Sequence, residues 1–206
     1  GHEIIFVDDG STDGTAERLV ALKSEIPNFR PLRHDRNLGQ SRGIHTGIHA
    51  ARGDIIVTLD GDGQNDPADI PALLAKLRAD PGLGMVSGVR VKRQDTASRR
   101  IASRLGNRFR DAMLGDGATD TGCGIKAFYR EAFLDIPYFD HMHRYLIALV
   151  QRHGWKVAYV PVNHRPRLTG RSKYTNLGRT LVSIQDMLGV RWLQRRHGGA
   201  TQIEEL

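Results

Sequence analysis

Short apolar runs alternate with segments of helical periodicity along the first half of the chain. Ile4 to Val7 and Ile55 to Leu59 are rich in β-branched residues and end at Asp/Gly-rich turns, which predicts two buried strands. Between them, Asn37 to Ala51 has apolar residues at helical spacing and is followed by Gly53. Over residues 1–91 the expected order is β-α-β-α-β-α-β. We therefore expect an α/β fold with a doubly wound, mostly parallel sheet flanked by helices.

The second half of the chain contains fewer strands and more basic residues. Strands are expected at 121–129 and 155–162, with a helix at 139–153 between them. Seven Lys and Arg residues between Lys92 and Arg110 are spaced along one expected helix. This basic helix is open to two interpretations, a solvated charged face or a phosphate-binding lid.

The region 177–196 has the pattern of an amphipathic helix. Leu177, Leu181, Ile184 and Leu188 fall on one face at three- and four-residue spacing. Trp192 and several arginines follow at its end. A helix lying on a membrane surface and a helix packed on the domain core both fit this pattern. Residues 197–206 are polar and are expected to form a frayed tail.

Length and composition indicate one soluble domain, expected over residues 1–196 of the 206. Hydrophobic residues make up 39% of the chain and charged residues 26%, which is ordinary for a globular protein. No apolar run is long enough to span a membrane, and no signal peptide precedes the first strand. The single Cys123 fits a reducing cytoplasm. The net charge of +7 favours an anionic partner such as nucleic acid, a phosphorylated substrate or an anionic lipid surface.

The strand predicted at Ile55–Leu59 ends in two carboxylates, Asp60 and Asp62, which are followed by Gln64. Ligands bind beyond the carboxyl ends of strands in open α/β sheets, and Mg²⁺ or Mn²⁺ prefers such oxygen ligands. A calcium loop of the EF-hand type is excluded, because Asn65 and Pro71 stand where Gly and Glu are needed. By itself the motif leaves a metal site and a plain turn equally open.

Three motifs in order resemble the inverting glycosyltransferases of family 2, which have the GT-A nucleotide-sugar-binding fold. They are Asp8-Asp9-Gly10-Ser11, Asn37-Leu38-Gly39 and Asp60-Gly61-Asp62-Gly63-Gln64. The segments from Asp120 to Arg130 and from Arg167 to Tyr174 resemble the polyprenyl-phosphate branch, which includes dolichol-phosphate mannosyltransferase and bacterial undecaprenyl-phosphate enzymes. The resemblance covers roughly residues 3 to 196.

This resemblance implies transfer of a hexose from a nucleotide diphosphate sugar to a polyprenyl phosphate, aided by Mg²⁺ or Mn²⁺. The acceptor is a lipid phosphate, so the enzyme is expected in the cytoplasm, peripherally bound to the anionic inner face of the cell membrane. No motif beyond basic charge supports a nucleic-acid partner, and no oligomeric state is predicted.

The resemblance also implies a role for each matched residue. Two alternatives stay open: Asp8 and Asp9 could only cap the turn that follows them, and Asp120 could only cap the strand that it precedes. The implied roles are metal binding for Asp60, Asp62 and Gln64; donor binding for Asp8, Asp9, Asp60 and Gly61; catalysis for Asp120 and Asp62; and acceptor-phosphate binding for Arg167, Lys173, Lys126 and Arg90.

The chain departs from the family pattern at its start, where the first strand of the family is expected to be missing. The Gln-x-x-Arg-Trp motif of processive synthases is also absent, because Gln185 lies six residues before Arg191. Two alternative functions remain: a family 2 enzyme with another acceptor in envelope polysaccharide or lipid synthesis, and a nucleotide-sugar-binding domain without turnover.

Overall fold

A computed structural model of the chain describes residues 1–91, 97–166 and 176–196, with the backbone alone at 97–105 and 176–181. The predicted tail at 197–206 lies outside the described residues. The chain divides into two compact units, Gly1–Ile56 with Tyr129–His143, and Val57–Phe128 with Arg144–Leu206. The region expected to be one domain, 1–196, thus contains residues of both units.

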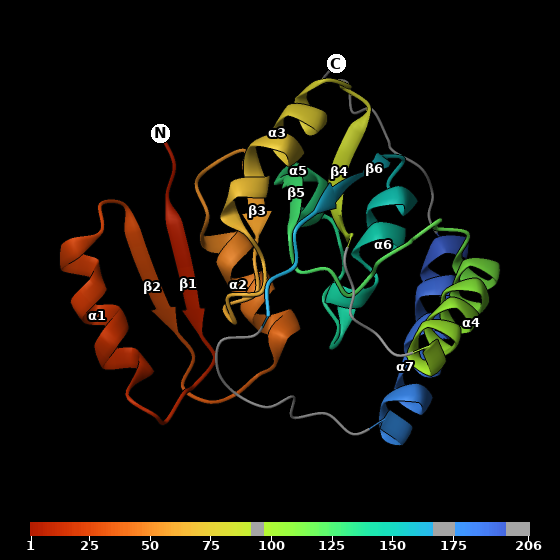
Figure 1. Cartoon of the computed structure of the whole chain (residues 1–206), viewed down its shortest axis with the longest axis horizontal. Helices are drawn as coiled ribbons and strands as arrows, with labels where there is room; N and C mark the ends of the chain where they lie inside the picture. The colour runs from red at the N-terminus through yellow and green to blue at the C-terminus, as the bar shows by residue number, and fades with distance from the viewer. Residues whose placement is uncertain (92–96, 167–175, 197–206) are drawn as a thin grey trace, which may run out of the picture. The chain divides into compact units, whose positions relative to one another are not determined.

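The first unit is built on a two-stranded parallel sheet. Ile4 lies opposite Phe29 and Asp8 lies opposite Arg33. One helix packs against each strand, α1 on β2 and α2 on β1, as Figure 1 shows for the red and orange elements. Its elements are β1 (Ile4–Asp8), α1 (Thr15–Glu25), β2 (Phe29–Arg33), α2 (Gln40–Ala50) and the short helix α5 (Glu131–Leu134).

A second sheet has four strands in the order β3-β5-β4-β6. The pair β4–β6 is parallel, whereas β4–β5 is antiparallel. The predicted α/β class is confirmed, but the sheet is less parallel than expected. Strand β5 follows a long excursion through α4, so it is not held to the parallel direction by a short βαβ connection. The strands are β3 (Ile55–Thr58), β4 (Leu83–Arg90), β5 (Lys126–Tyr129) and β6 (Lys156–Val162).

Helices α3 and α6 pack on strands β4 and β6 and close the core of the second unit (Figure 1). Residues 83–88 of β4 are all buried, as a strand covered on both faces requires. Five consecutive residues of α6, 146–150, are also buried. The helical elements of this part are η1 (Pro67–Asp69), α3 (Ile70–Arg78), α4 (Ala97–Leu114), α6 (Leu146–Arg152) and α7 (Asn176–Arg195), with η2 (Met142–Arg144) before α6.

A buried polar network ties α4, α6 and α7 together. The guanidinium of Arg110 pairs with the carboxylate of Asp116, with Nε 3.0 Å from Oδ2, and both side chains are at most 9% exposed. The same guanidinium donates to the carbonyl oxygen of Arg144 over 2.8 Å. Tyr145, at the start of α6, donates to the carbonyl oxygen of Ser183 in α7 over 2.9 Å. Because these hydrogen bonds are directional, the network fixes the positions of α4, α6 and α7 relative to one another more strictly than apolar packing would.

Two predicted elements are shorter in the structure. The predicted strand at 121–129 is reduced to β5, because Asp120 pairs with Arg90 and its carbonyl accepts from the backbone N–H of Cys123, which turns the chain. The predicted helix at 139–153 begins only at Leu146, after a residue in the left-handed region, His141, with φ 68°.

Candidate functional site

The two carboxylates predicted to bind metal lie just beyond β3, on a turn that is braced by its own side chains. The backbone N–H of Asp60 donates to Oδ1 of Asn65 over 3.0 Å. The backbone N–H of Gln64 donates to Oδ1 of Asp62 over 3.1 Å. Asn65 is buried, whereas Asp60 and Asp62 are partly exposed. The turn therefore has a fixed backbone and accessible carboxylates.

The chemistry of this turn fits a hard divalent cation. Asp60, Asp62 and Gln64 offer carboxylate and amide oxygens, the ligands that Mg²⁺ and Mn²⁺ prefer. Over residues 1–91, 97–166 and 176–196, no three or more His, Cys, Asp and Glu side chains cluster in a way that could hold a metal ion. Mg²⁺ is commonly held by one or two carboxylates and completed by water and substrate phosphates, so an open site of this kind suits it.

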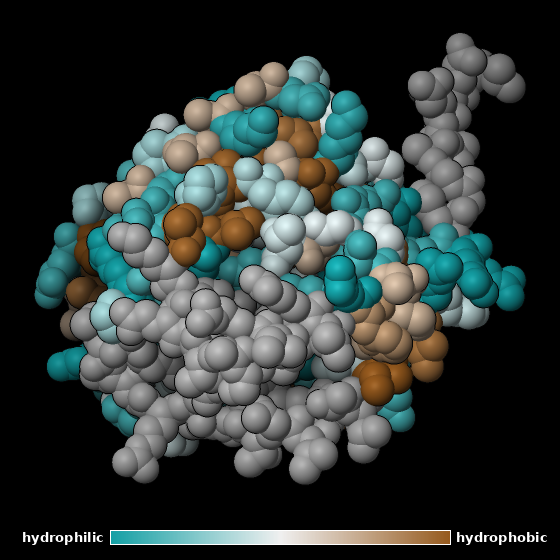
Figure 2. Space-filling model, turned by 45° about the vertical axis from the view of Figure 1, so that its right-hand side comes forward, coloured by the Kyte–Doolittle hydropathy of each residue, from teal (hydrophilic) through white to brown (hydrophobic). Residues whose placement is uncertain are grey.

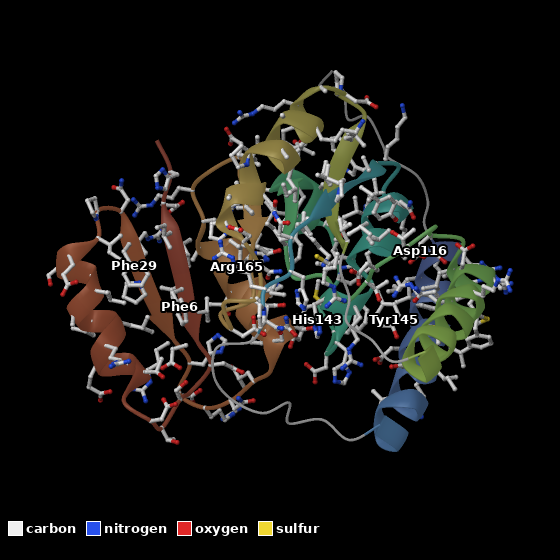
Figure 3. All side chains as sticks on the ribbon, in the orientation of Figure 1. Phe6, Phe29, Asp116, His143, Tyr145 and Arg165 are labelled. Carbon is white, nitrogen blue, oxygen red and sulfur yellow. The ribbon has the colours of Figure 1, made fainter. Side chains whose placement is uncertain are left out.

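Residues 163–166, which we term the strap, run alongside the segment that follows this turn (Figure 3). The backbone N–H of Arg165 donates to the carbonyl of Gln64 over 2.9 Å, and its guanidinium pairs with Asp66 at 2.7 Å. Nε2 of His164 lies 3.3 Å from Nε2 of Gln64. The strap is thus fastened beside a predicted metal ligand.

Two predicted acceptor residues, Arg167 and Lys173, lie outside the described residues. In the chain they follow the strap, so Arg167 comes only two residues after Arg165. Their predicted role stays a prediction.

Asp120 and Arg90, predicted for catalysis and phosphate binding, are paired with one another. Nε and Nη2 of Arg90 donate to the two carboxylate oxygens of Asp120 over 2.7 and 2.6 Å, and the backbone N–H of Arg90 adds a bond of 3.2 Å. Asp120 is only 6% exposed. This bidentate geometry is typical of a structural ion pair. For Arg90 or Asp120 to bind a substrate, the hydrogen bonds between them would have to break, or one of them would have to bind the substrate while still paired.

Lys126, another predicted phosphate ligand, is buried and only 5% exposed. Its ammonium donates to the carbonyl oxygen of Cys123. Burial lowers the pKa of Lys126, while the nearby charges of Asp60 and Asp120 act in the opposite direction. The geometry therefore favours an internal counter-charge over a surface cation that receives a phosphate.

In the first unit, Asp8 is buried at the carboxyl end of β1, and one of its two carboxylate oxygens forms no hydrogen bond with the part of the chain that the structure describes. Its Oδ1 accepts from the backbone N–H of Ser11 over 3.0 Å. Its Oδ2 is buried and has no hydrogen-bond partner within residues 1–91, 97–166 and 176–196, although Nε of Arg33 lies 3.4 Å away. Buried carboxylate oxygens are almost always hydrogen-bonded, so Oδ2 is suited to accept from a ligand N–H or O–H.

The neighbouring Asp9 is used inside the protein. Its Oδ1 lies 2.7 Å from Nδ1 of His34 and accepts from the backbone N–H of Leu38 over 2.9 Å, and its Oδ2 accepts from that of Gly39 over 2.7 Å. Burial alone would raise the pKa of Asp9, but these hydrogen bonds outweigh burial and the pKa is lowered. Asp9 therefore shapes the Asn37–Gly39 turn, and its predicted contact with the donor stays a prediction.

Two residues that support the turn, Asn65 and His164, are absent from the predicted site. Asn65 directly follows an Asp/Gly-rich turn, where Asn side chains commonly bond to nearby backbone, and that signal could have identified it. His164 is distant from the turn in sequence, and nothing in a single sequence shows that residues one hundred positions apart meet.

Comparison with known proteins identifies relatives over most of the chain. The model of the family described as glycosyl transferase family 2 matches residues 1–136. The undecaprenyl-phosphate 4-deoxy-4-formamido-L-arabinose transferase of Enterobacter sp. (strain 638) is 38% identical over 175 residues. This alignment covers 84% of the chain and 53% of the relative, so the chain spans about half the length of that curated relative.

Solved structures share the fold at lower identity. Glucosyl-3-phosphoglycerate synthase from Mycobacterium tuberculosis, solved with Mn²⁺, uridine diphosphate and glucosyl-3-phosphoglycerate, has a TM-score of 0.65 at 22% identity, covering 97% of this chain and 70% of that one. A mannosyltransferase from Pyrobaculum calidifontis, solved with GDP-Man and Mn²⁺, has a TM-score of 0.62 at 22% identity, covering 97% and 56%. This likeness confirms the predicted GT-A fold.

Proposed function

The chain belongs to glycosyl transferase family 2, and from that premise we propose that it transfers a hexose from a nucleotide diphosphate sugar to a polyprenyl phosphate. The observation that carries this proposal is the carboxylate turn, where Asp60 and Asp62 are partly exposed just beyond the end of β3 on a backbone fixed by hydrogen bonds. The strap fastened to it leads directly into the basic segment that contains Arg167. The similarity to an undecaprenyl-phosphate transferase supports the choice of acceptor class.

The leaving group of this reaction is a nucleoside diphosphate, which departs slowly unless its charge is neutralised. Asp60, Asp62 and Gln64 would hold Mg²⁺ or Mn²⁺, which supplies that neutralisation when bound. The protein's own task is to keep the ligand oxygens in place, and Asn65 contributes by fixing the backbone N–H of Asp60. Gly61 has no side chain, so a donor can approach the backbone beside these carboxylates.

The donor's base or ribose is assigned to Asp8. Its buried Oδ2 has no hydrogen-bond partner among the described residues and would accept a hydrogen bond from the nucleoside. Asp9 takes a positioning role because both of its oxygens hold the Asn37–Gly39 turn and His34. The two adjacent carboxylates thus have different tasks.

The acceptor phosphate is assigned to Arg167 and Lys173. A phosphate monoester is already anionic at neutral pH, so it needs cations that position it more than a base that deprotonates it. Arg90 and Lys126 have internal partners and are given supporting roles. Asp120 accepts hydrogen bonds from Nε and Nη2 of Arg90, and in this assignment the pair stabilises the loop before β5.

The direct test is a turnover assay with undecaprenyl phosphate, Mn²⁺ and a panel of labelled UDP- and GDP-hexoses. Asp60→Asn and Asp62→Asn should each lower turnover by roughly 100-fold or more while the circular dichroism spectrum is retained. Asp54→Asn, an equal charge change at the exposed start of β3, serves as the control and should stay near wild-type activity. Equal activity of all three variants would refute the metal assignment, and turnover with phosphoglyceric acid alone would favour a soluble acceptor.

We further propose that α7 lies on an anionic lipid surface. Ile184, Leu188 and Trp192 form a stripe at four-residue spacing and are 38, 54 and 58% exposed. The opposite face packs into the unit through Met187 and Val190, which are 8 and 0% exposed. Figure 2 shows hydrophobic residues reaching the surface among hydrophilic ones on one face of the molecule.

Basic residues adjoin this stripe near the end of α7. Arg191, Arg195 and Arg196 flank the exposed Trp192, and the guanidinium of Arg196 lies 5.8 Å from the centre of its ring. An apolar stripe bordered by arginines is typical of a helix at a headgroup layer. None of the helices described here is both long and apolar enough to span a bilayer.

A further inference from the structure

Gly124 lies directly against the carboxylate of Asp60. A Cβ atom added at position 124 would lie 2.5 Å from Cγ of Asp60 and 2.8 Å from Oδ1 of Asn65, and closer still to a carboxylate oxygen. The backbone of Gly124 is outside the left-handed region, so alanine could adopt its conformation. Glycine is therefore needed here for space alone, and the space is filled by a predicted metal ligand.

The peptide of Gly124 cannot easily move away from Asp60. Oγ1 of Thr58, at the end of β3, donates to the carbonyl oxygen of Gly124 over 2.9 Å. The next residue, Ile125, is fully buried and its carbonyl accepts from the backbone N–H of Gly88 in β4. A methyl group at position 124 would consequently push on the carboxylate of Asp60 and not on a loose loop.

Two residues further on, Lys126 brings a buried positive charge to the same place. Its ammonium is held by the carbonyl of Cys123, inside the unit. The charges of Asp60 and Asp120 act on this ammonium, and Asp120 already has a bidentate partner in Arg90. The carbonyl of Cys123 belongs to the peptide that links Cys123 to Gly124, so the ammonium lies beside the residue that contacts Asp60 and serves as an internal cation for that carboxylate.

We propose that Gly124 and Lys126 are positioning residues for Asp60: Gly124 gives the carboxylate room, and Lys126 balances its charge in the absence of the divalent cation. The inference rests on the proposed metal role of Asp60. If the proposal holds, Gly124 and Lys126 influence metal affinity. They act through Asp60 and not through contact with the acceptor.

The steric half is tested with Mn²⁺ alone, titrated against the protein and followed by the electron paramagnetic resonance signal of free Mn²⁺. Gly124→Ala should weaken Mn²⁺ binding by about 10- to 100-fold, the usual effect of disturbing a residue that supports a metal ligand. Gly106→Ala, at a helical glycine of α4 without a positive φ and with nothing within 4 Å of the added atom, is the control and should bind as the wild type does.

A second variant keeps this half testable if Gly124→Ala folds poorly. Asp60→Ala/Gly124→Ala removes the carboxylate that the new methyl group contacts. The double variant should therefore regain most of the melting temperature that Gly124→Ala loses relative to the wild type. A double variant that melts as low as Gly124→Ala would overturn the steric assignment, because the clash would then lie elsewhere.

The electrostatic half is tested with Lys126→Met, and with Lys156→Met at an exposed lysine as the control. Removing the buried ammonium should lower the melting temperature of the metal-free protein. Adding Mn²⁺ should then raise the melting temperature of the variant by more than it raises that of the wild type. Mn²⁺ affinity should also rise by roughly threefold or more, because a competing cation has been removed.

The outcomes separate this inference from the function on which it rests. If the wild type binds Mn²⁺ but Gly124→Ala and Lys126→Met bind it equally well, the inference is wrong and the metal site stands. If Lys126→Met changes only the KM for undecaprenyl phosphate, Lys126 is an acceptor ligand as the sequence predicts. If the wild type binds no Mn²⁺ and Asp60→Asn retains turnover, the proposed metal site itself is overturned.

Discussion

At the scale of single residues, the adjacent carboxylates Asp8 and Asp9 show how local geometry divides similar side chains between tasks. One buried oxygen of Asp8 has no hydrogen bond to any described residue, whereas both oxygens of Asp9 accept from the Asn37–Gly39 turn or from His34. The first arrangement is costly unless a ligand completes it, and the second stabilises the fold. Their roles can therefore be separated by measuring stability and ligand binding independently.

The lowered pKa of Asp9 predicts a defined pH dependence. A carboxyl group whose folded pKa is below its ordinary 3.8 stabilises the fold above that value and loses this contribution as the pH falls through the folded pKa. Asp9→Asn should lower the free energy of unfolding by about 1–3 kcal/mol at pH 7. Urea titrations from pH 7 to pH 3 should show this difference narrowing below about pH 4. A difference that is constant across the range would contradict the assignment.

Gly10 provides a prediction about a tight turn. Its φ is 72°, and an added Cβ would lie 2.5 Å from the carbonyl carbon of Arg36 and 2.7 Å from the backbone nitrogen of Asn37. Gly10→Ala should therefore destabilise the protein by roughly 3 kcal/mol, through strain and a backbone clash. Gly14→Ala has a similar φ of 77° but open space, so it isolates the strain and should cost about 1 kcal/mol. Thermal unfolding of both variants measures the difference, and equal losses would exclude the clash.

At the scale of elements, the buried pair of Arg110 and Asp116 holds α4 to its neighbours. Arg110→Met leaves the carboxylate of Asp116 buried without its cation, and should lower the free energy of unfolding by about 3–5 kcal/mol. Arg110→Met/Asp116→Leu removes both charges and should be clearly more stable than the single variant. Chemical denaturation of the single and the double variant measures the free energy of unfolding of each. A double variant that is less stable than the single one would show that Asp116 acts through another contact, such as its bond to the backbone N–H of Ala118.

Helix α7 illustrates why one amphipathic pattern supported two interpretations. Its Met187 and Val190 are buried, which confirms that the helix packs on the unit. Two residues of the predicted apolar face, Ile184 and Leu188, do not pack on the unit in this way, because they are exposed. A helix with apolar residues on two faces can pack on the core with one face and present the other to a partner.

At the scale of the whole molecule, the net charge of +7 and the exposed stripe of α7 predict reversible membrane binding. Each Arg near an anionic surface contributes about 1 kcal/mol, so three arginines give a few kcal/mol before any apolar insertion. The protein should cosediment with anionic liposomes at low salt and be released at high salt. Leu188→Ser/Trp192→Ser should weaken binding, whereas Val20→Ser, at a residue 68% exposed in α1, should not. Equal sedimentation with neutral liposomes would contradict the electrostatic part.

The sequence by itself determined the element order, the α/β class and the family. Hydrophobic periodicity and turn residues are local signals, so the order from β1 to β4 is as predicted. The motif at Asp60–Gln64 is equally local, since its residues are neighbours in the chain. The position of its two carboxylates just beyond the end of β3 could therefore be predicted without a structure.

Only the tertiary structure decided which residues become partners across the chain. Arg90 and Asp120 are thirty residues apart, and nothing local shows that they neutralise one another. The family resemblance assigns Lys126 to the acceptor phosphate, and the sequence does not show that folding buries this side chain. Gly124 looks like one more turn glycine until the carboxylate of Asp60 is found against it. Pairing and burial depend on contacts between distant segments, and these contacts are fixed by packing and not by local pattern.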